Sequence, residues 1–204
     1  GILWAVLQPM MIMIVFNVLF GLLMGRNNKP TVEGVPYAIS TYAALVPWQM
    51  FATAVAGSSN SLVQNGLLLK KVYFPKLIAP IYPVITTLVD FALAFVVLLG
   101  MIAFYHFFTD YTFQFSWALL MLPVFVLLAC MTALSIGLWL SSLNAIYRDI
   151  KYVIPFMVSL LQFVSPVVYT TDSILSNQPE WVRFVYGLNP MAGVIQGFRW
   201  ALLD

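Results

Sequence analysis

The sequence predicts an all-α integral membrane protein, a polytopic bundle of helices that cross the bilayer. Of its 204 residues, 62% are apolar and 8% are charged, and the mean hydropathy is +0.95. The charges are separated by long uncharged runs, at residues 1–25, 34–69, 111–147 and 152–171. A helix of about 20 apolar residues crosses the ~30 Å hydrocarbon layer. A water-soluble domain of this size lacks the interior to bury four such runs.

The uncharged runs predict five spans in a single transmembrane domain, residues 1–204. We place these spans at residues 1–24, 37–57, 81–105, 118–140 and 152–169. Both ends of the chain are expected to be cut, because Gly1 starts inside a helix and Asp204 follows an unfinished apolar segment.

The segment between the second and third spans has a different pattern. Ser58 to Ser61 offer good helix N-caps, and residues 62–72 then have the pattern of a short amphipathic helix that stops near Pro75. This stretch also carries lysines without an acidic neighbour. The sequence therefore predicts a capped, rigid helix in the loop 58–80.

The loop charges predict the orientation in the membrane. Loops 58–80 and 141–151 lie on one side and hold five Lys or Arg residues against one acid, Asp149. The loops on the other side hold three basic residues against four acidic ones. The positive-inside rule therefore places loops 58–80 and 141–151 in the cytoplasm.

Two short helices are expected after the fifth span. A helix cap precedes residues 179–186, and the first turn of this segment holds a proline and an acid. Asn189 with Pro190 starts a second helix, which runs towards residue 203. Neither is long enough to span, so we expect both at the outer interface, re-entrant or lying flat, with Trp181 and Tyr186 at headgroup depth. A plain surface loop with two helical turns is the simpler alternative.

The sequence contains no catalytic or metal-binding constellation. The only histidine is His106, the only cysteine is Cys130, and there is no glycine-rich phosphate loop ending in Lys-Ser or Lys-Thr. We therefore expect neither enzyme activity nor a cofactor in this chain. The net charge of +2 is too small to predict a nucleic-acid partner.

Three stretches together resemble a known family. They are Lys70-Lys71-Val72-Tyr73-Phe74-Pro75-Lys76; Asn144-Ala145-Ile146-Tyr147-Arg148-Asp149-Ile150 with Pro155 and Ser165-Pro166-Val167-Val168-Tyr169; and Leu188-Asn189-Pro190-Met191 with Gly197-Phe198-Arg199. Their order and spacing, with Trp4 and Gln8-Pro9, are similar to the membrane subunit of ABC transporters that export O-antigen, teichoic acid or capsule. That family usually has an amphipathic helix before the first span and a sixth span at the end.

The resemblance implies a homodimer that works with two nucleotide-binding ATPase subunits, which would hold ATP and magnesium. It implies that residues 60–74 form a coupling helix that docks on the ATPase. The expected coupling residues are Asn60, Leu62, Lys70, Lys71, Tyr73, Phe74, Arg148 and Asp149. Two alternatives remain open: the lysines contact anionic lipid, and Arg148 with Asp149 fixes the loop.

Aromatic residues make up 16% of the chain and predict where a glycan passes. A sugar ring packs its apolar face on an aromatic ring, so we expect a channel lined by spans 1, 2 and 5, although ordinary helix packing explains any single residue. The lining candidates are Trp4, Tyr42, Trp48, Phe51, Phe163 and Tyr169, and the outer-gate candidates are Trp181, Tyr186, Asn189 and Pro190.

Asp90 is the one acidic residue inside a predicted span. Carboxylates within the bilayer are costly and face a bundle interior or water. Thr86 and Thr87 lie one turn away, so we expect a hydrogen bond with a threonine rather than a role in a transport path.

The resulting hypothesis is the membrane subunit of an ATP-driven exporter of a lipid-linked cell-surface polysaccharide, in the bacterial cytoplasmic membrane. The main alternative is an exporter of the same fold that carries a drug, a pigment or a haem-like molecule. An intramembrane transferase would need clustered acids or histidines, which this sequence lacks. A structural scaffold would not need the capped, rigid helix predicted in the loop 58–80.

Overall fold

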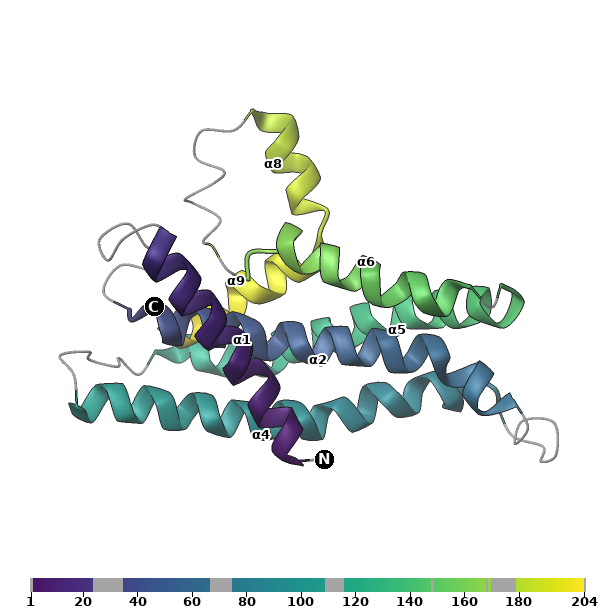
Figure 1. Cartoon of the computed structure of the whole chain (residues 1–204), viewed down its shortest axis with the longest axis horizontal. Coiled ribbons are helices and arrows are strands. Elements are labelled where there is room, and N and C mark those ends of the chain that lie inside the picture. Colours follow the sequence, from purple (N-terminus) through teal and green to yellow (C-terminus); the bar gives the residue numbers. More distant parts are fainter. Residues whose placement is uncertain are drawn as a thin grey trace.

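The computed structural model describes residues 2–23, 35–66, 75–108, 116–147, 149–167, 169 and 179–203. Regular structure in these ranges is helical. The elements in chain order are α1 (Ile2–Leu23), α2 (Tyr37–Gln64), α4 (Ile78–Phe108), the 3₁₀ helix η1 (Trp117–Met121), α5 (Leu122–Ile146), α6 (Ile150–Val164), α8 (Glu180–Gly187) and α9 (Pro190–Leu203). The long helices α2, α4 and α5 run side by side, and α1 crosses α2 and α4 obliquely (Figure 1).

Helix α2 is the centre of the bundle. It contacts α1, α4, α5, α6 and α9, and from Tyr37 to Met50 every residue except Gln49 is buried. Its serines, its tyrosines and Thr41 are thereby withdrawn from lipid, since polar side chains in a membrane are favoured at helix–helix contacts. The more apolar helices α4 and α5 pack around it.

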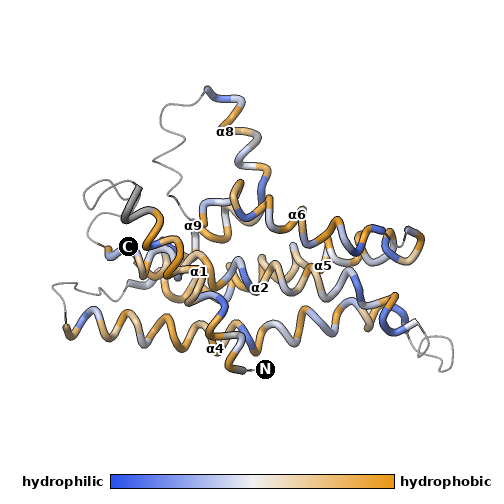
Figure 2. Tube along the Cα trace, in the orientation of Figure 1, coloured by the Kyte–Doolittle hydropathy of each residue, from blue (hydrophilic) through white to orange (hydrophobic). Residues whose placement is uncertain are grey.

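Helices α4 and α5 carry the clearest membrane signal. Ile78–Phe108 and Trp117–Ile146 are long and apolar enough to cross a membrane, and only 22% and 11% of their most apolar stretches are buried in the chain. A helix from the core of a soluble protein is mostly buried, whereas these expose apolar side chains. Figure 2 shows that hydrophobic residues recur along the length of α4. The exposed side chains include Ile85, Val89, Val96, Leu99, Val124, Leu127, Met131 and Trp139. This is the surface that a lipid-facing helix requires.

Small residues allow α2 and α5 to pack closely. The face of α5 that is buried consists of Ala129, Ala133, Gly137, Ser141 and Asn144. Gly137 lies directly against Ser58 of α2: a Cβ at this glycine would stand 2.5 Å from Ser58 Oγ. Only glycine fits at this contact, as is common where two membrane helices meet.

The predicted helix start at Ser58–Ser61 is wrong, because α2 continues through these residues to Gln64. Their side chains bond back to the same helix instead of capping a new one: Ser59 Oγ donates to Ala56 O at 2.9 Å, and Ser61 Oγ donates to Ser58 O at 2.6 Å. Such back-bonding satisfies the hydroxyls within a continuous helix.

The other predicted helices lie close to the observed ones. The third and fourth spans fall inside α4 and η1–α5, and the last two helices begin at Glu180 and Pro190. The fifth span is shorter than expected, because α6 ends at Val164 and residues 165–167 form a turn. Helix α9 packs against α2, α5 and η1, so it belongs to the bundle and does not lie flat on its surface.

Candidate functional site

A hydrogen-bonded pair of asparagines joins the ends of α2 and α5. Asn144 Nδ2 donates to Asn60 Oδ1 at 2.9 Å and to Ser59 O at 3.1 Å. Asn144 is buried, and Asn60 Nδ2 donates to Ala56 O at 3.0 Å. Each asparagine lies within the last turns of its helix, at the end of the bundle where α4 and α6 begin (Figure 1). We call this contact the amide junction.

The amide junction brings together the two segments that were predicted to contact an ATPase. Asn60 and half-buried Leu62 lie in the last turns of α2, and Asp149 is exposed immediately before α6. Five further coupling candidates lie outside the described residues: Lys70, Lys71, Tyr73, Phe74 and Arg148. Asn60 and Asn144 belong to separate segments of the sequence, and their pairing appears only in the fold.

A buried arginine joins α9 to α2 and to the turn after α6. Arg199 is 6% exposed. Its guanidinium donates four hydrogen bonds to backbone carbonyls: Nε to Ser40 O (3.1 Å), Nη1 to Pro166 O (2.8 Å) and Tyr169 O (2.9 Å), and Nη2 to Val167 O (2.8 Å). We call this cluster the arginine junction. The planar guanidinium of arginine holds its donors in a fixed arrangement that can reach several carbonyls at once, which the ammonium of a lysine cannot do.

Asn189 reinforces the same region. Its Nδ2 donates to Ser165 Oγ at 2.9 Å, and its Oδ1 accepts from Met191 N at 3.1 Å, which caps the start of α9. Of the other gate candidates, Pro190 is the first residue of α9, Tyr186 is half-buried at the end of α8, and Trp181 is exposed on α8. The residues near the end of α6 and the start of α9 therefore form one connected cluster.

Three of the channel-lining candidates are wrong. Tyr42, Trp48 and Phe51 are 0%, 1% and 2% exposed, so their rings pack within one copy of the chain and do not face a channel between two copies. Spacing along the sequence could not distinguish the inward face of α2 from an exposed one, because neighbouring helices surround it. Trp4 and Phe163 are exposed and Tyr169 is half-buried.

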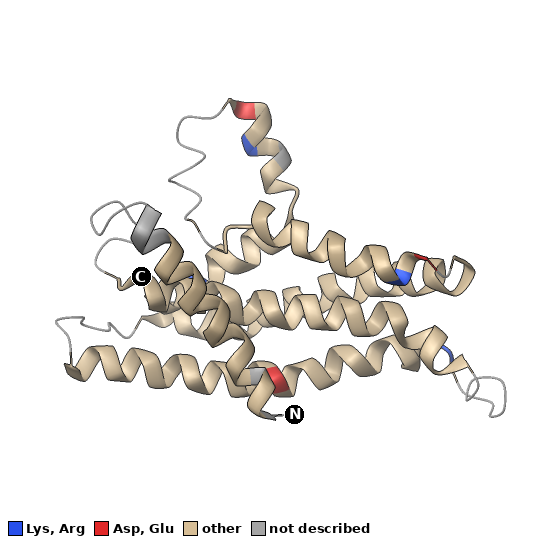
Figure 3. Cartoon of the chain, viewed as in Figure 1, with Lys and Arg blue, Asp and Glu red and all other residues tan. Residues whose placement is uncertain are grey.

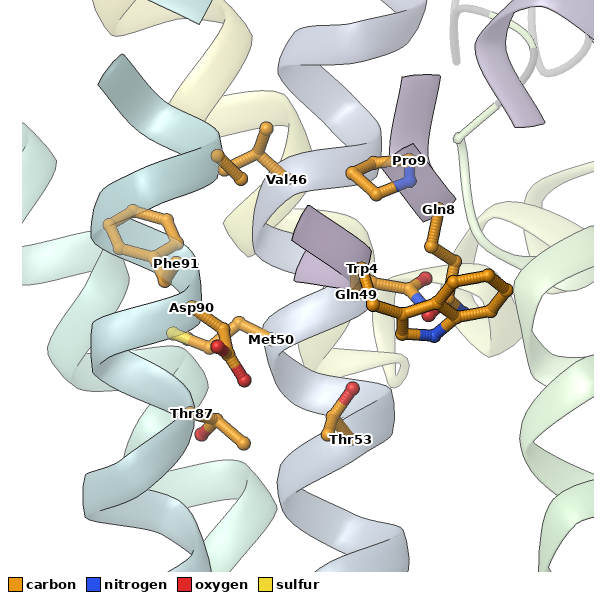
Figure 4. A pocket seen from close by; sticks show the side chains of 11 residues that line it. Trp4, Gln8, Pro9, Val46, Gln49, Met50, Thr53, Thr87, Asp90 and Phe91 are labelled. Atoms are coloured by element: carbon orange, nitrogen blue, oxygen red, sulfur yellow. The ribbon is translucent and has the colours of Figure 1, made fainter. Parts of the chain in front are cut away.

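A cavity of about 430 Å³ lies between α1, α2 and α4 (Figure 4). Its polar lining comes from all three helices: Gln8 on α1, Gln49 and Thr53 on α2, and Thr87 and Asp90 on α4. Its aromatic lining includes Trp4 and Phe91. The chain therefore contains a cavity of mixed polar and apolar lining beside the middle of its longest apolar helix.

Asp90 is the only charged residue of α4 (Figure 3). The expected bond with a threonine is wrong, because both hydroxyls donate to carbonyls of their own helix: Thr86 Oγ1 to Pro83 O at 2.9 Å and Thr87 Oγ1 to Val84 O at 2.8 Å. The carboxylate instead faces the cavity, where its side chain is exposed.

Comparison with known proteins places the chain in a family. The family model described as ABC-2 type transporter matches residues 1–203. The chain belongs to the ABC-2 type transporter family. This ABC-2 chain is a membrane subunit, which agrees with its all-helical fold and its exposed apolar helices.

Curated relatives of this ABC-2 chain are export permeases. It is 29% identical to "O-antigen export system permease protein RfbA" of Myxococcus xanthus, over 98% of this chain and 71% of that protein. Two proteins of the same name from Klebsiella pneumoniae are 26% and 25% identical, with the same coverage of both chains.

Proposed function

We propose that this chain is the membrane subunit of an ATP-driven exporter that moves a lipid-linked cell-surface polysaccharide across a bacterial cytoplasmic membrane. One observation carries the proposal: three proteins named as O-antigen export permeases align with 98% of the chain.

The exporter is proposed to be a homodimer of this chain with two separate ATPase subunits, which bind ATP and magnesium. The sequence lacks a glycine-rich phosphate loop, and closed symmetric dimers are the commonest homo-oligomers. The amide junction supports the coupling role, because a hydrogen bond between Asn60 and Asn144 makes the ends of α2 and α5 move together when an ATPase presses on either one.

Loops 58–80 and 141–151 are proposed to face the cytoplasm. The excess of Lys and Arg in these loops supports this orientation, as does the position of the helix ends that flank them at one end of the bundle. The arginine junction then lies towards the opposite face, and Trp181, Tyr186, Asn189 and Pro190 would form the outer gate. The aromatic residues that remain candidates for the channel lining are exposed Trp4 and Phe163 and half-buried Tyr169.

Deletion of the gene tests the proposed function. Cells without it should lose surface polysaccharide and accumulate the lipid-linked polymer inside, and a plasmid copy of the intact gene should restore the surface signal. Antibody or lectin staining of whole cells and of lysates measures both pools. Normal surface polymer in the deletion strain would contradict the proposal and favour an exporter of a small molecule.

A further inference from the structure

We propose that the cavity between α1, α2 and α4 is a binding site for a sugar ring, with Asp90 as its charged hydrogen-bond acceptor. This inference rests on the proposed export of a polysaccharide and adds a specific site to it. The site comprises Asp90, Gln8, Gln49, Thr53 and the ring of Trp4.

The lack of a hydrogen-bond partner for Asp90 in the described part of the chain supports this site. A carboxylate at membrane depth is costly and is normally paired with another protein group. Within the described part of the chain, Asp90 forms neither a hydrogen bond nor an ion pair, and the nearby threonine hydroxyls donate to carbonyls of α4. Its side chain points into the cavity (Figure 4). Among the described residues, the carboxylate is therefore left open to water or to a ligand that brings hydrogen-bond donors.

The chemistry of the lining also supports this site. An ionised carboxylate only accepts hydrogen bonds, whereas the amides of Gln8 and Gln49 and the hydroxyl of Thr53 both donate and accept. The hydroxyl groups of a sugar also donate and accept, so they match this mixture. Trp4 and Phe91 add apolar ring surface, on which the C–H face of a sugar packs.

Other classes of ligand match the lining of this cavity less well than a sugar does. A divalent cation takes six or more oxygen ligands, usually with several carboxylates, and Asp90 is the only charged residue in the lining. An acyl chain would strip water from the carboxylate and the amides without replacing their hydrogen bonds. An organic amine would pair with Asp90 through its charge alone and would leave the neutral amides and the hydroxyl of the lining unused. The volume of about 430 Å³ is within the ordinary range for small-ligand sites.

Two substitutions at position 90 separate a sugar from a cation. Asp90→Leu removes the acceptor, and Asp90→Asn removes the charge but keeps an acceptor oxygen. For a sugar ligand, Asp90→Leu should lower surface polymer about tenfold, the value of one hydrogen bond, while Asp90→Asn retains most of it because its amide oxygen still accepts that bond. Val96→Leu, on the exposed apolar face of α4, is the matched control.

The assay uses the full-length transporter with its ATPase in the deletion strain, and polymer carrying a radioactive sugar is the probe. A benzophenone amino acid at position 53 should cross-link to this polymer, and the same group at position 96 should not. Membrane abundance and co-purification with the ATPase show that each variant is folded. If Asp90→Leu does not accumulate, Gln49→Leu and Thr53→Val replace it and should reduce export in the same way.

Each result decides the inference. Loss of export in Asp90→Leu but not in Asp90→Asn, with cross-linking at position 53 alone, supports the sugar site. Full export by Asp90→Leu, or equal cross-linking at positions 53 and 96, overturns it while the deletion phenotype leaves the proposed function in place. Equal loss in both Asp90 variants without cross-linking indicates a cation and also overturns it. Normal surface polymer in the deletion strain removes the proposed function itself.

Discussion

Asn144 of α5 donates a hydrogen bond of 2.9 Å to Asn60 of α2, a residue 84 positions earlier in the chain. The same amide group reaches Ser59 O. The bond connects the last turns of two helices whose following loops are both proposed to face the ATPase. We therefore expect movement of one helix end to be transmitted to the other through this contact.

Replacing Asn144 by alanine should lower the free energy of unfolding by about 1–2 kcal/mol. The substitution removes both hydrogen bonds of Nδ2 and leaves Ser59 O without this partner, and interhelical hydrogen bonds in membrane proteins have this magnitude. Thermal unfolding in detergent measures the change. Ser142→Ala is the control, because Ser142 is exposed and bonds within its own helix. Equal stability of the two variants would contradict a role for the amide junction.

Replacing Arg199 by lysine should destabilise the protein by about 3 kcal/mol. A lysine ammonium cannot reproduce the planar fork that reaches four carbonyls, so several buried carbonyl oxygens would lose their donor. The yield of monodisperse protein and its thermal midpoint report the loss. Gln196→Ala changes an exposed residue of the same helix and should leave both values as they are. A lysine variant with normal stability would show that the junction matters little.

Gly137→Ala should separate α2 from α5 and cost about 1–3 kcal/mol, since an added methyl group would overlap Ser58. The cost should be smaller in a Ser58→Gly background, which removes the side chain that the methyl group meets. Gly100→Ala is a matched control in another helix. No atom lies within 4 Å of the added methyl group there, so about 0.5–1 kcal/mol of stabilisation is expected. Equal responses at positions 137 and 100 would disprove the close contact.

Tyr73→Ala combined with Phe74→Ala should abolish co-purification of the ATPase while the chain remains in the membrane. The prediction follows from the proposed docking of residues 60–74, because aromatic side chains commonly anchor protein interfaces. Affinity purification from detergent extracts measures the partner. Tyr82→Ala, at an exposed position of α4, should retain it. Unchanged co-purification by the double variant would remove the docking assignment.

Much of the helical order was predictable from sequence because apolar runs, prolines and caps act locally. Asn189 and Pro190 illustrate this: a cap followed by a first-turn proline indicated the start of α9, and the structure confirms it. Ser58–Ser61 illustrate the limit. The same residue types cap a helix or bond back within one, and the choice depends on α5, whose small residues are far away in the chain.

The site was less predictable, since burial is a property of the assembled bundle. Tyr42, Trp48 and Phe51 looked like lining residues but face the core, because α2 is surrounded by other helices. Arg199 was noticed only as part of a motif, and nothing in its local sequence indicates that backbone carbonyls from α2 and from the turn after α6 converge on it. Asp90 was noticed as an isolated charge, but the polar groups around it come from three helices.

The arginine junction also determines how this part of the chain tolerates mutation. All four acceptors belong to the main chain, at residues 40, 166, 167 and 169. A carbonyl oxygen is present whatever side chain occupies the position, so side-chain substitutions there leave the acceptor in place. The donor has no such substitute. The arginine junction therefore tolerates side-chain substitution at its four acceptor positions, whereas its donor position requires one residue type, the arginine at position 199.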